Sequence, residues 1–344
     1  MAIYLGYESA IEMICYLRTR VGDDGSWCKA CTKTLRKDAV HTKRELMGMD
    51  GRALTLLDNL SRPLHVLVRS QEQVTMSKDL HPHLWNGDVG RRAFTDLGHG
   101  VYLSMPSFVF LQMATSLSRV ELIMLGMMLC GYYSPGPAFG RSERKGSLAV
   151  PLTDLHMQMV RSAQAFQLEP LCTESALKSF LESNAGVRGI KAAKAALPWV
   201  RNTSASHMET ALYLLLCLPV RMGGYGLPKP YLNPLVRIEQ ANGSSICYPD
   251  LYWPGASIDM EYNSDWAHSS VSAHYLDSRR LTAIVCNDID YLSISTGQLR
   301  NAQDMDNAAR GLARKLKHRI RYADEEWRRK RALLRSAVLP PIDQ

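Results

Sequence analysis

Two carboxylates in the C-terminal half of the chain have the spacing of a divalent metal site. Asp250 follows a short apolar run, and Glu261 belongs to residues 258–263, in which apolar and polar side chains alternate strictly. This alternation predicts a strand, and the Pro254-Gly255 turn predicts a hairpin in which Asp250 lies across from Glu261. Two opposed carboxylates repel each other unless a cation lies between them, and their hard oxygen atoms suit Mg²⁺ or Mn²⁺. A surface hairpin with solvated acids is the alternative.

A third acidic residue, Glu209, is a candidate ligand for the same ion. It lies three residues after Ser206, at the start of a long apolar run. The spacing Ser206-x-x-Glu209 is also that of a capping box at a helix N-terminus, which would explain Glu209 without any metal. The sequence therefore predicts a helix that begins near residue 206, and it leaves both roles of Glu209 open.

The order of these residues resembles a nuclease signature. Residues 249–263 contain Pro-Asp, ten further residues and Glu-x-Asn, which resembles the PD-(D/E)xK signature with Asn263 in the Lys position. The chain continues with His268 and then D-x-R-R at residues 277–280, which is similar to the endonuclease domain related to very-short-patch-repair enzymes. The likeness covers roughly residues 170–325. It implies a metal-dependent endonuclease that hydrolyses phosphodiester bonds in DNA, with Asp250 and Glu261 as its catalytic metal ligands.

The same resemblance suggests roles for four further residues. Asn263 would supply a dipole where the family's Lys supplies a positive charge to the transition state. His268 would act as an acid or base, because its unperturbed pKa lies near neutral pH; a structural or solvent-facing loop histidine is the alternative. Arg279 and Arg280 would hold phosphate, unless one of them pairs with Asp277.

Positive charge is concentrated near the C-terminus. The segment Arg310–Arg335 contains eleven basic and three acidic residues, an excess as large as the net charge of +8 of the whole chain. Such a segment can follow a nucleic-acid backbone, so we expect Arg328, Arg329 and Lys330 to bind DNA. The alternatives are a solvated helix face that Trp327 anchors to the protein, and a surface that meets an acidic protein partner.

Composition is that of an ordinary globular protein without a membrane segment. The 344 residues, 46% hydrophobic and 22% charged, are enough for about two domains. No apolar run reaches the ~18 residues that cross a bilayer, and no basic leader precedes the first apolar residues. Eight cysteines are scattered along the chain, partly within apolar runs, which indicates buried thiols in the cytoplasm. We expect no membrane association, and the oligomeric state stays open.

We expect an α/β (α+β) protein with four parts. Residues 1–150 form a mostly helical α+β region that resembles AbiEi-type antitoxin or regulator proteins of bacteria, and residues 151–205 form a helical connector. Residues 206–325 form a restriction-endonuclease-like mixed sheet flanked by helices, and residues 326–344 a basic tail. This arrangement leaves two functions open: an active endonuclease in a defence or toxin–antitoxin context, or a catalytically inactive, nuclease-like DNA-binding regulator.

Several local patterns give further expectations. Strands are predicted at residues 64–68, 100–103, 235–240, 283–286 and 291–294. Cys28-x-x-Cys31 lacks a second ligand pair, so we expect ordinary thiols and no zinc. His81 and His83 have no evident partners in the sequence, and we expect them in a surface loop.

Overall fold

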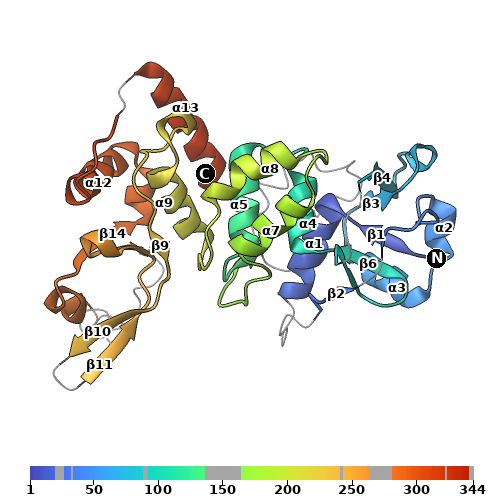
Figure 1. Ribbon diagram of the computed structural model, residues 1–344, viewed down its shortest axis with the longest axis horizontal. Helices are drawn as coiled ribbons and strands as arrows, with labels where there is room; N and C mark the ends of the chain where they lie inside the picture. The colour runs from blue at the N-terminus through green and yellow to red at the C-terminus, as the bar shows by residue number, and fades with distance from the viewer. Residues whose placement is uncertain are drawn as a thin grey trace. The chain divides into compact units, whose positions relative to one another are not determined.

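The computed structural model describes residues 1–19, 27–31, 34–87, 92–135, 164–240, 243–263, 281–321 and 324–340. The chain divides into two compact units, Met1–Val200 and Arg201–Gln344, each built on its own mixed sheet (Figure 1). Helices and mixed sheets occur in both units, which confirms the α/β (α+β) class. Within the described residues, every helix falls short of the length and apolarity that crossing a membrane requires.

The N-terminal unit has a six-stranded sheet with the order β2-β5-β6-β1-β3-β4. Its strand β1 runs parallel to β6 and antiparallel to β3, and β3 runs parallel to β4 at the edge. The strands are β1 (Ile3–Leu5), β2 (Ala30–Cys31), β3 (Leu64–Val68), β4 (Leu80–Leu84), β5 (Phe94–Asp96) and β6 (Val101–Ser104). The strands predicted at residues 64–68 and 100–103 are confirmed as β3 and β6.

Helices cover this sheet and extend into a bundle. Helix α1 packs on β3 and against α4, and α4, α5, α7 and α8 pack on one another (Figure 1). Helices α4 and α5 are apolar on nearly all sides, so both are buried almost completely. The helices of the unit are α1 (Tyr7–Arg18), α2 (Lys43–Met47), α3 (Gly51–Leu57), α4 (Pro106–Met113), α5 (Arg119–Leu129), α7 (Glu174–Ser183) and α8 (Ile190–Ala196).

Short elements complete the N-terminal unit. They are the 3-10 turns η1 (Gln71–Gln73) and η2 (Leu197–Trp199) and the antiparallel pair β7 (Ser134–Pro135) and β8 (Gln164–Ala165). None of the cysteines in the described residues, Cys28 and Cys31 included, forms a disulfide.

The C-terminal unit has a four-stranded sheet with the order β14-β13-β12-β9. Strand β12 runs antiparallel to both β9 and β13, whereas β13 and β14 are parallel. Strands β10 and β11 form a separate antiparallel hairpin. The strands are β9 (Tyr231–Leu232), β10 (Val236–Gln240), β11 (Gly243–Cys247), β12 (Leu251–Trp253), β13 (Ile258–Asn263) and β14 (Asp290–Ser295). The predicted strands at residues 235–240 and 291–294 are confirmed as β10 and β14.

Strand β13 is covered on both faces. Ile258 and Met260 are buried, as the alternation predicts, but so are Asp259 and Glu261 on the opposite face. Helix α9 packs against this strand, and α13 packs against α9. The acids of β13 therefore lie inside the unit, which contradicts a surface hairpin with solvated acids.

The helices of the C-terminal unit are α9 (His207–Cys217), α11 (Thr296–Arg300), α12 (Ala302–Lys315) and α13 (Glu325–Val338), with 3-10 turns η3 (Val220–Met222) and η4 (Pro254–Ala256). Residues 281–286 are also helical, so the strand predicted at 283–286 is wrong. The reason is that only Ile284 of this run is buried, where it packs with Ile238, Cys247 and Ile289. One buried position per turn suits a helix, whereas a strand of this length would bury alternate residues.

Candidate functional site

Asp250 and Glu261 lie opposite each other at one end of the β12–β13 hairpin. The register pairs Leu251 with Met260, so Asp250 faces Glu261 one position further along. The backbone amide of Tyr262 donates a hydrogen bond of 2.7 Å to Oδ2 of Asp250, which holds this side chain against β13. Glu261 is 7% exposed. The hairpin that the Pro-Gly turn predicts therefore places the two residues on facing positions, with Glu261 buried and Asp250 half-buried.

Glu209 approaches the same end of the hairpin from the first turn of α9. The hydroxyl of Ser206 accepts a bond from the Glu209 amide, so Ser206 caps the helix. Oε2 of Glu209, however, accepts hydrogen bonds of 2.8 Å from the Ala205 amide and from Nδ2 of Asn233. Asn233 in turn donates its amide to the Asp250 carbonyl at 3.2 Å. The Glu209 side chain is thus directed toward the start of β12. The predicted helix cap at Ser206 is confirmed, and the role of Glu209 as a metal ligand stays a prediction.

The electrostatics of Glu209 reflect this arrangement. Burial, followed by the negative charge of Asp250, raises the pKa of Glu209 to about 7. Hydrogen bonds from Ala205 and Asn233 oppose the shift without cancelling it. A cation bound at this end of the hairpin would favour the ionised form, because it would offset the repulsion between the two carboxylates.

The three acids are not a compact ligand set. In the described residues, the group whose ligand atoms all lie within 4.8 Å of one another is formed by histidines, so Glu209, Asp250 and Glu261 are spaced more widely. Mg²⁺ commonly takes one or two carboxylates and keeps several water molecules. The opposed pair Asp250 and Glu261 is consistent with that mode of binding, with Glu209 beside it.

Asn263 occupies the last position of β13. It shares the face of Glu261, because the two residues are two positions apart on a strand. Its Nδ2 donates a hydrogen bond of 2.6 Å to Oγ of Ser293 on β14, the residue that pairs with Glu261. This hydrogen bond ties the Asn263 side chain to the neighbouring strand β14, on the same face of the sheet as Glu261.

Three of the expected site residues fall outside the described residues. They are His268, Arg279 and Arg280. Asp265 and Asp277 also lie outside the described residues. Their roles stay predictions from the sequence.

The basic residues of α13 divide into buried and exposed groups. Arg328 and Arg329 are exposed, and Nζ of Lys330 lies 2.5 Å from Oε1 of Glu326 one turn earlier. Trp327 is buried and donates its Nε1–H to the Gly224 carbonyl at 3.2 Å. The predicted basic tail is thus an anchored helix with two exposed arginines side by side.

Arg331, in the same helix, is buried and makes contacts within the protein. Its guanidinium donates to Oδ1 of Asp306 at 2.7 Å and to the Ala302 carbonyl, and it lies over the rings of Tyr225 and Trp327. These contacts join α13 to α12. Arg331 is therefore occupied within the protein, in contrast to its neighbours Arg328 and Arg329.

A second candidate site was not anticipated from the sequence. His65, His81 and His83 form the histidine group mentioned above, and all three lie in the N-terminal unit. His81 and His83 belong to β4, so the expectation of a surface loop is wrong. Pro82 between them suggested a loop, but among the described strands β4 lies at the edge of the sheet beside β3, and an edge tolerates a proline. The alternation of apolar residues and histidines in Leu-His-Pro-His-Leu was the feature of the sequence that indicated a strand.

The strand register explains why these histidines meet. His65 on β3 pairs with His81 on β4, and Leu67 pairs with His83. His81 and His83 share one face of β4 because they are two residues apart. The ring centroids of His81 and His83 lie 4.3 Å apart. The ring centroid of His65 lies 4.7 Å from that of His81 and 5.0 Å from that of His83.

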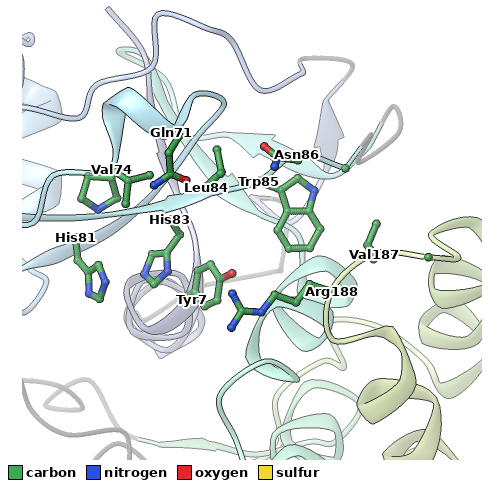
Figure 2. Close-up of a pocket in the computed structure, with 13 residues that line it drawn as sticks. Tyr7, Gln71, Val74, His81, His83, Leu84, Trp85, Asn86, Val187 and Arg188 are labelled. Carbon is green, nitrogen blue, oxygen red and sulfur yellow. The ribbon is translucent and has the colours of Figure 1, made fainter.

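A pocket of about 640 Å³ adjoins this histidine group. Figure 2 shows His83 stacked against Tyr7, with the guanidinium of Arg188 directed toward the same ring. The ring centroids of Tyr7 and His83 are 3.9 Å apart. Burial, followed by the positive charges of neighbouring groups, lowers the pKa of His83 to about 2, and burial also lowers the pKa of His81. Trp85 and Asn86, which follow the end of β4, also line the pocket.

No protein-family model matches the chain, and neither a curated protein nor a solved structure does.

Proposed function

We propose that the C-terminal unit is a metal-dependent endonuclease that hydrolyses phosphodiester bonds in DNA. The observation that carries this proposal is the opposition of Asp250 and Glu261 across the β12–β13 hairpin, with Glu209 joined to the same end through Asn233. Carboxylates on facing positions of a hairpin repel each other when both are ionised, and a cation bound between them would offset that repulsion. Mg²⁺ or Mn²⁺ suits their oxygen donors.

The architecture of the unit supports this function. Helix α9 is followed by the antiparallel strands β9, β12 and β13, then by a helical segment at residues 281–286 and by the parallel strand β14. This mixed sheet with flanking helices agrees with the restriction-endonuclease-like fold that the PD-(D/E)xK resemblance implies. A fold alone does not establish an activity, so the proposal depends on the carboxylates.

The residues present fit a hard divalent ion. Asp250 and Glu261 would hold it directly, and Glu209 would contribute a further carboxylate or hold one of its water molecules. The ion would supply the positive charge that polarises the scissile phosphate and lowers the pKa of an attacking water molecule. The amide of Tyr262 fixes the orientation of the Asp250 carboxylate before substrate binds.

Other residues would contribute to substrate binding and proton transfer. His268 would accept or donate the proton, and Arg279 and Arg280 would contact phosphate, as the resemblance implies. Exposed Arg328 and Arg329 on α13 would bind the DNA backbone through charge. Asn263 offers a dipole in place of the usual lysine. A cytoplasmic setting, in a bacterial defence or toxin–antitoxin context, would give such an enzyme access to DNA.

Nicking of supercoiled plasmid in the presence of Mg²⁺ or Mn²⁺ tests this proposal. Asp250→Asn and Glu261→Gln each remove one negative charge at nearly constant shape and should reduce nicking at least ~10²-fold. Glu239→Gln is the matched control, because Glu239 is an exposed acid on β10 of the same unit. Nicking that persists in both site variants, or that does not require a divalent ion, would exclude this site.

A nuclease-like DNA-binding regulator without catalytic activity is the second candidate. It is favoured by Asn263, whose side chain is bound to Ser293 and brings no positive charge to the site. Such a protein would bind DNA without a divalent metal, and the Asp250→Asn change would leave that binding unaltered. Gel-shift titration in EDTA, together with the nicking assay, distinguishes the two functions.

A further inference from the structure

We propose that the N-terminal unit binds a transition-metal ion of the zinc type through His65, His81 and His83. This site is separate from the carboxylates of the C-terminal unit and does not depend on the endonuclease proposal. It rests on the convergence of three imidazoles, on a carboxylate beside them and on a pocket next to two of the three histidines.

The spacing of the imidazole nitrogens is close to that of a metal-ligand set. Nε2 of His83 lies 3.0 Å from Nδ1 of His65, and the ligand atoms of all three histidines lie within 4.8 Å of one another. Nitrogens bound to one tetrahedral Zn²⁺ at 2.0–2.1 Å are about 3.3 Å apart. Small rotations of the rings would therefore give all three bonds. The parallel pairing of β3 and β4 holds the backbones of these residues in place.

Glu8 supplies the fourth polar group. Its Oε2 lies 2.5 Å from Nδ1 of His65. This oxygen is buried, and it accepts no hydrogen bond from the described residues, so the contact is close without having hydrogen-bond geometry. A buried carboxylate oxygen without a hydrogen bond, next to converging imidazole nitrogens, is an arrangement that a shared cation would stabilise. Glu8 would either bind the ion or hold His65 in the binding orientation.

The donor set selects the class of ion. Imidazole nitrogens suit Zn²⁺, Co²⁺, Ni²⁺ and Cu²⁺, whereas Mg²⁺ requires oxygen donors. The histidine site of the N-terminal unit and the carboxylate site of the C-terminal unit would therefore bind different metal ions.

The pocket gives the site access and room for a further ligand. His81 and His83 both line it, together with Tyr7 and Arg188 (Figure 2). Three protein ligands leave a coordination position for water or a small ligand, as in catalytic zinc sites. The exposed guanidinium of Arg188 would favour an anion at that position.

A hydrogen-bonded stack of histidines is the competing explanation. In that case the contact between His83 and His65 would be an ordinary hydrogen bond that joins β3 to β4. The stack would stabilise the edge of the sheet and would bind added metal no better than an exposed histidine does. Metal affinity therefore separates the two explanations.

The test is titration of the full chain, first freed of metal by a chelator, with Zn²⁺ in a calorimeter and with Co²⁺ by visible absorption. We expect one tight equivalent with the ligand-field bands of Co²⁺ in a nitrogen and oxygen environment. His81→Gln and His83→Gln should each weaken binding ~10²-fold or more, since changes to outer-shell partners alone cost 10–100-fold. Glu8→Gln should weaken it ~10-fold or more.

Two controls make the result decisive. His99→Gln changes an exposed histidine that pairs with Asp50 and should leave the affinity unchanged. A double Cys28→Ser and Cys31→Ser variant should also bind normally, which excludes the thiols. Thermal unfolding without metal shows that each variant is folded, and His81→Gln, at the less buried ring, is the variant least at risk. Affinity that is the same in the wild type and in folded His81→Gln, or that is lost only with the cysteines, would overturn the proposal.

Discussion

Asp250 lies close enough to Glu209 for its negative charge to add to the effect of burial and raise the pKa of Glu209 to about 7. The two residues come from different elements, the start of β12 and the first turn of α9, and Asn233 connects them by hydrogen bonds. Their closeness predicts that this end of the sheet loses stability when Glu209 ionises, and it is one reason why we propose a cation there.

Stability should fall as pH rises through the range in which Glu209 ionises. The pKa is about 7 in the folded protein against an ordinary 4.5, so the folded state binds more protons between these values. The stability gained from the protonated form is fully present below pH 4.5 and is lost as pH rises to 7. The loss amounts to roughly 3 kcal/mol at most. Urea unfolding without metal between pH 4.5 and 8 measures it.

Glu209→Gln provides the control for that prediction. A glutamine oxygen can still accept the bonds from Ala205 and Asn233, but it does not ionise. Its unfolding free energy should therefore depend less on pH across this range than that of the wild type. The same pH dependence in both proteins would show that Glu209 ionises normally.

Replacing Asn263 by lysine should maintain or increase cleavage. Asn263 lies on the face of Glu261, and a lysine there would add positive charge beside the transition state. Asn263→Gln is the matched control, since it lengthens the side chain without adding charge. The rates of plasmid nicking by the two variants are compared with the wild type. Cleavage that lysine abolishes and glutamine preserves would show that the position requires a neutral side chain.

The exposed arginines of α13 should contribute to DNA affinity through charge alone. The double change Arg328→Ala and Arg329→Ala should weaken binding to any sequence and reduce the slope of log affinity against log salt by about 2. Arg44→Ala with Arg52→Ala removes the same charge from exposed positions of the N-terminal unit. An effect of equal size in both double variants would assign it to net charge and not to α13.

Arg331 in the same helix should behave differently. It is buried and paired with Asp306, so Arg331→Met leaves that carboxylate without its cationic partner, although the Tyr225 hydroxyl still donates to it. Loss of one member of a buried ion pair costs about 3–5 kcal/mol. Thermal or urea unfolding should show this loss. If Arg331→Met weakens DNA binding without lowering stability, the ion pair with Asp306 has no structural role.

Local sequence patterns were sufficient to predict the hairpin of the carboxylate site. Alternation over residues 258–263 sets the strand, and the nearby Pro254-Gly255 turn sets the pairing, so the opposition of Asp250 and Glu261 follows from neighbouring residues. The short helix at residues 281–286 could not be predicted in the same way. Its assignment depends on Ile284 contacting Ile238 and Cys247, which are distant in the sequence.

The role of Glu209 and the histidine group also depend on distant partners. The capping spacing from Ser206 correctly predicts the start of α9, but Asn233 determines where the Glu209 side chain points. His65 meets His81 only because β3 and β4 pair in parallel. Neither the register of that pairing nor the edge position that tolerates Pro82 is evident from the residues near His81.

Binding of Mn²⁺, followed by electron paramagnetic resonance, tests the central claim most directly. Asp250→Asn and Glu261→Gln should each weaken the binding of one Mn²⁺ at least ~10-fold, because each removes a carboxylate ligand. Glu239→Gln and His83→Gln should retain it, which separates this site from surface acids and from the histidine group. Mn²⁺ binding that is unchanged in folded Asp250→Asn and Glu261→Gln would contradict the assignment of the β12–β13 carboxylates as the metal site.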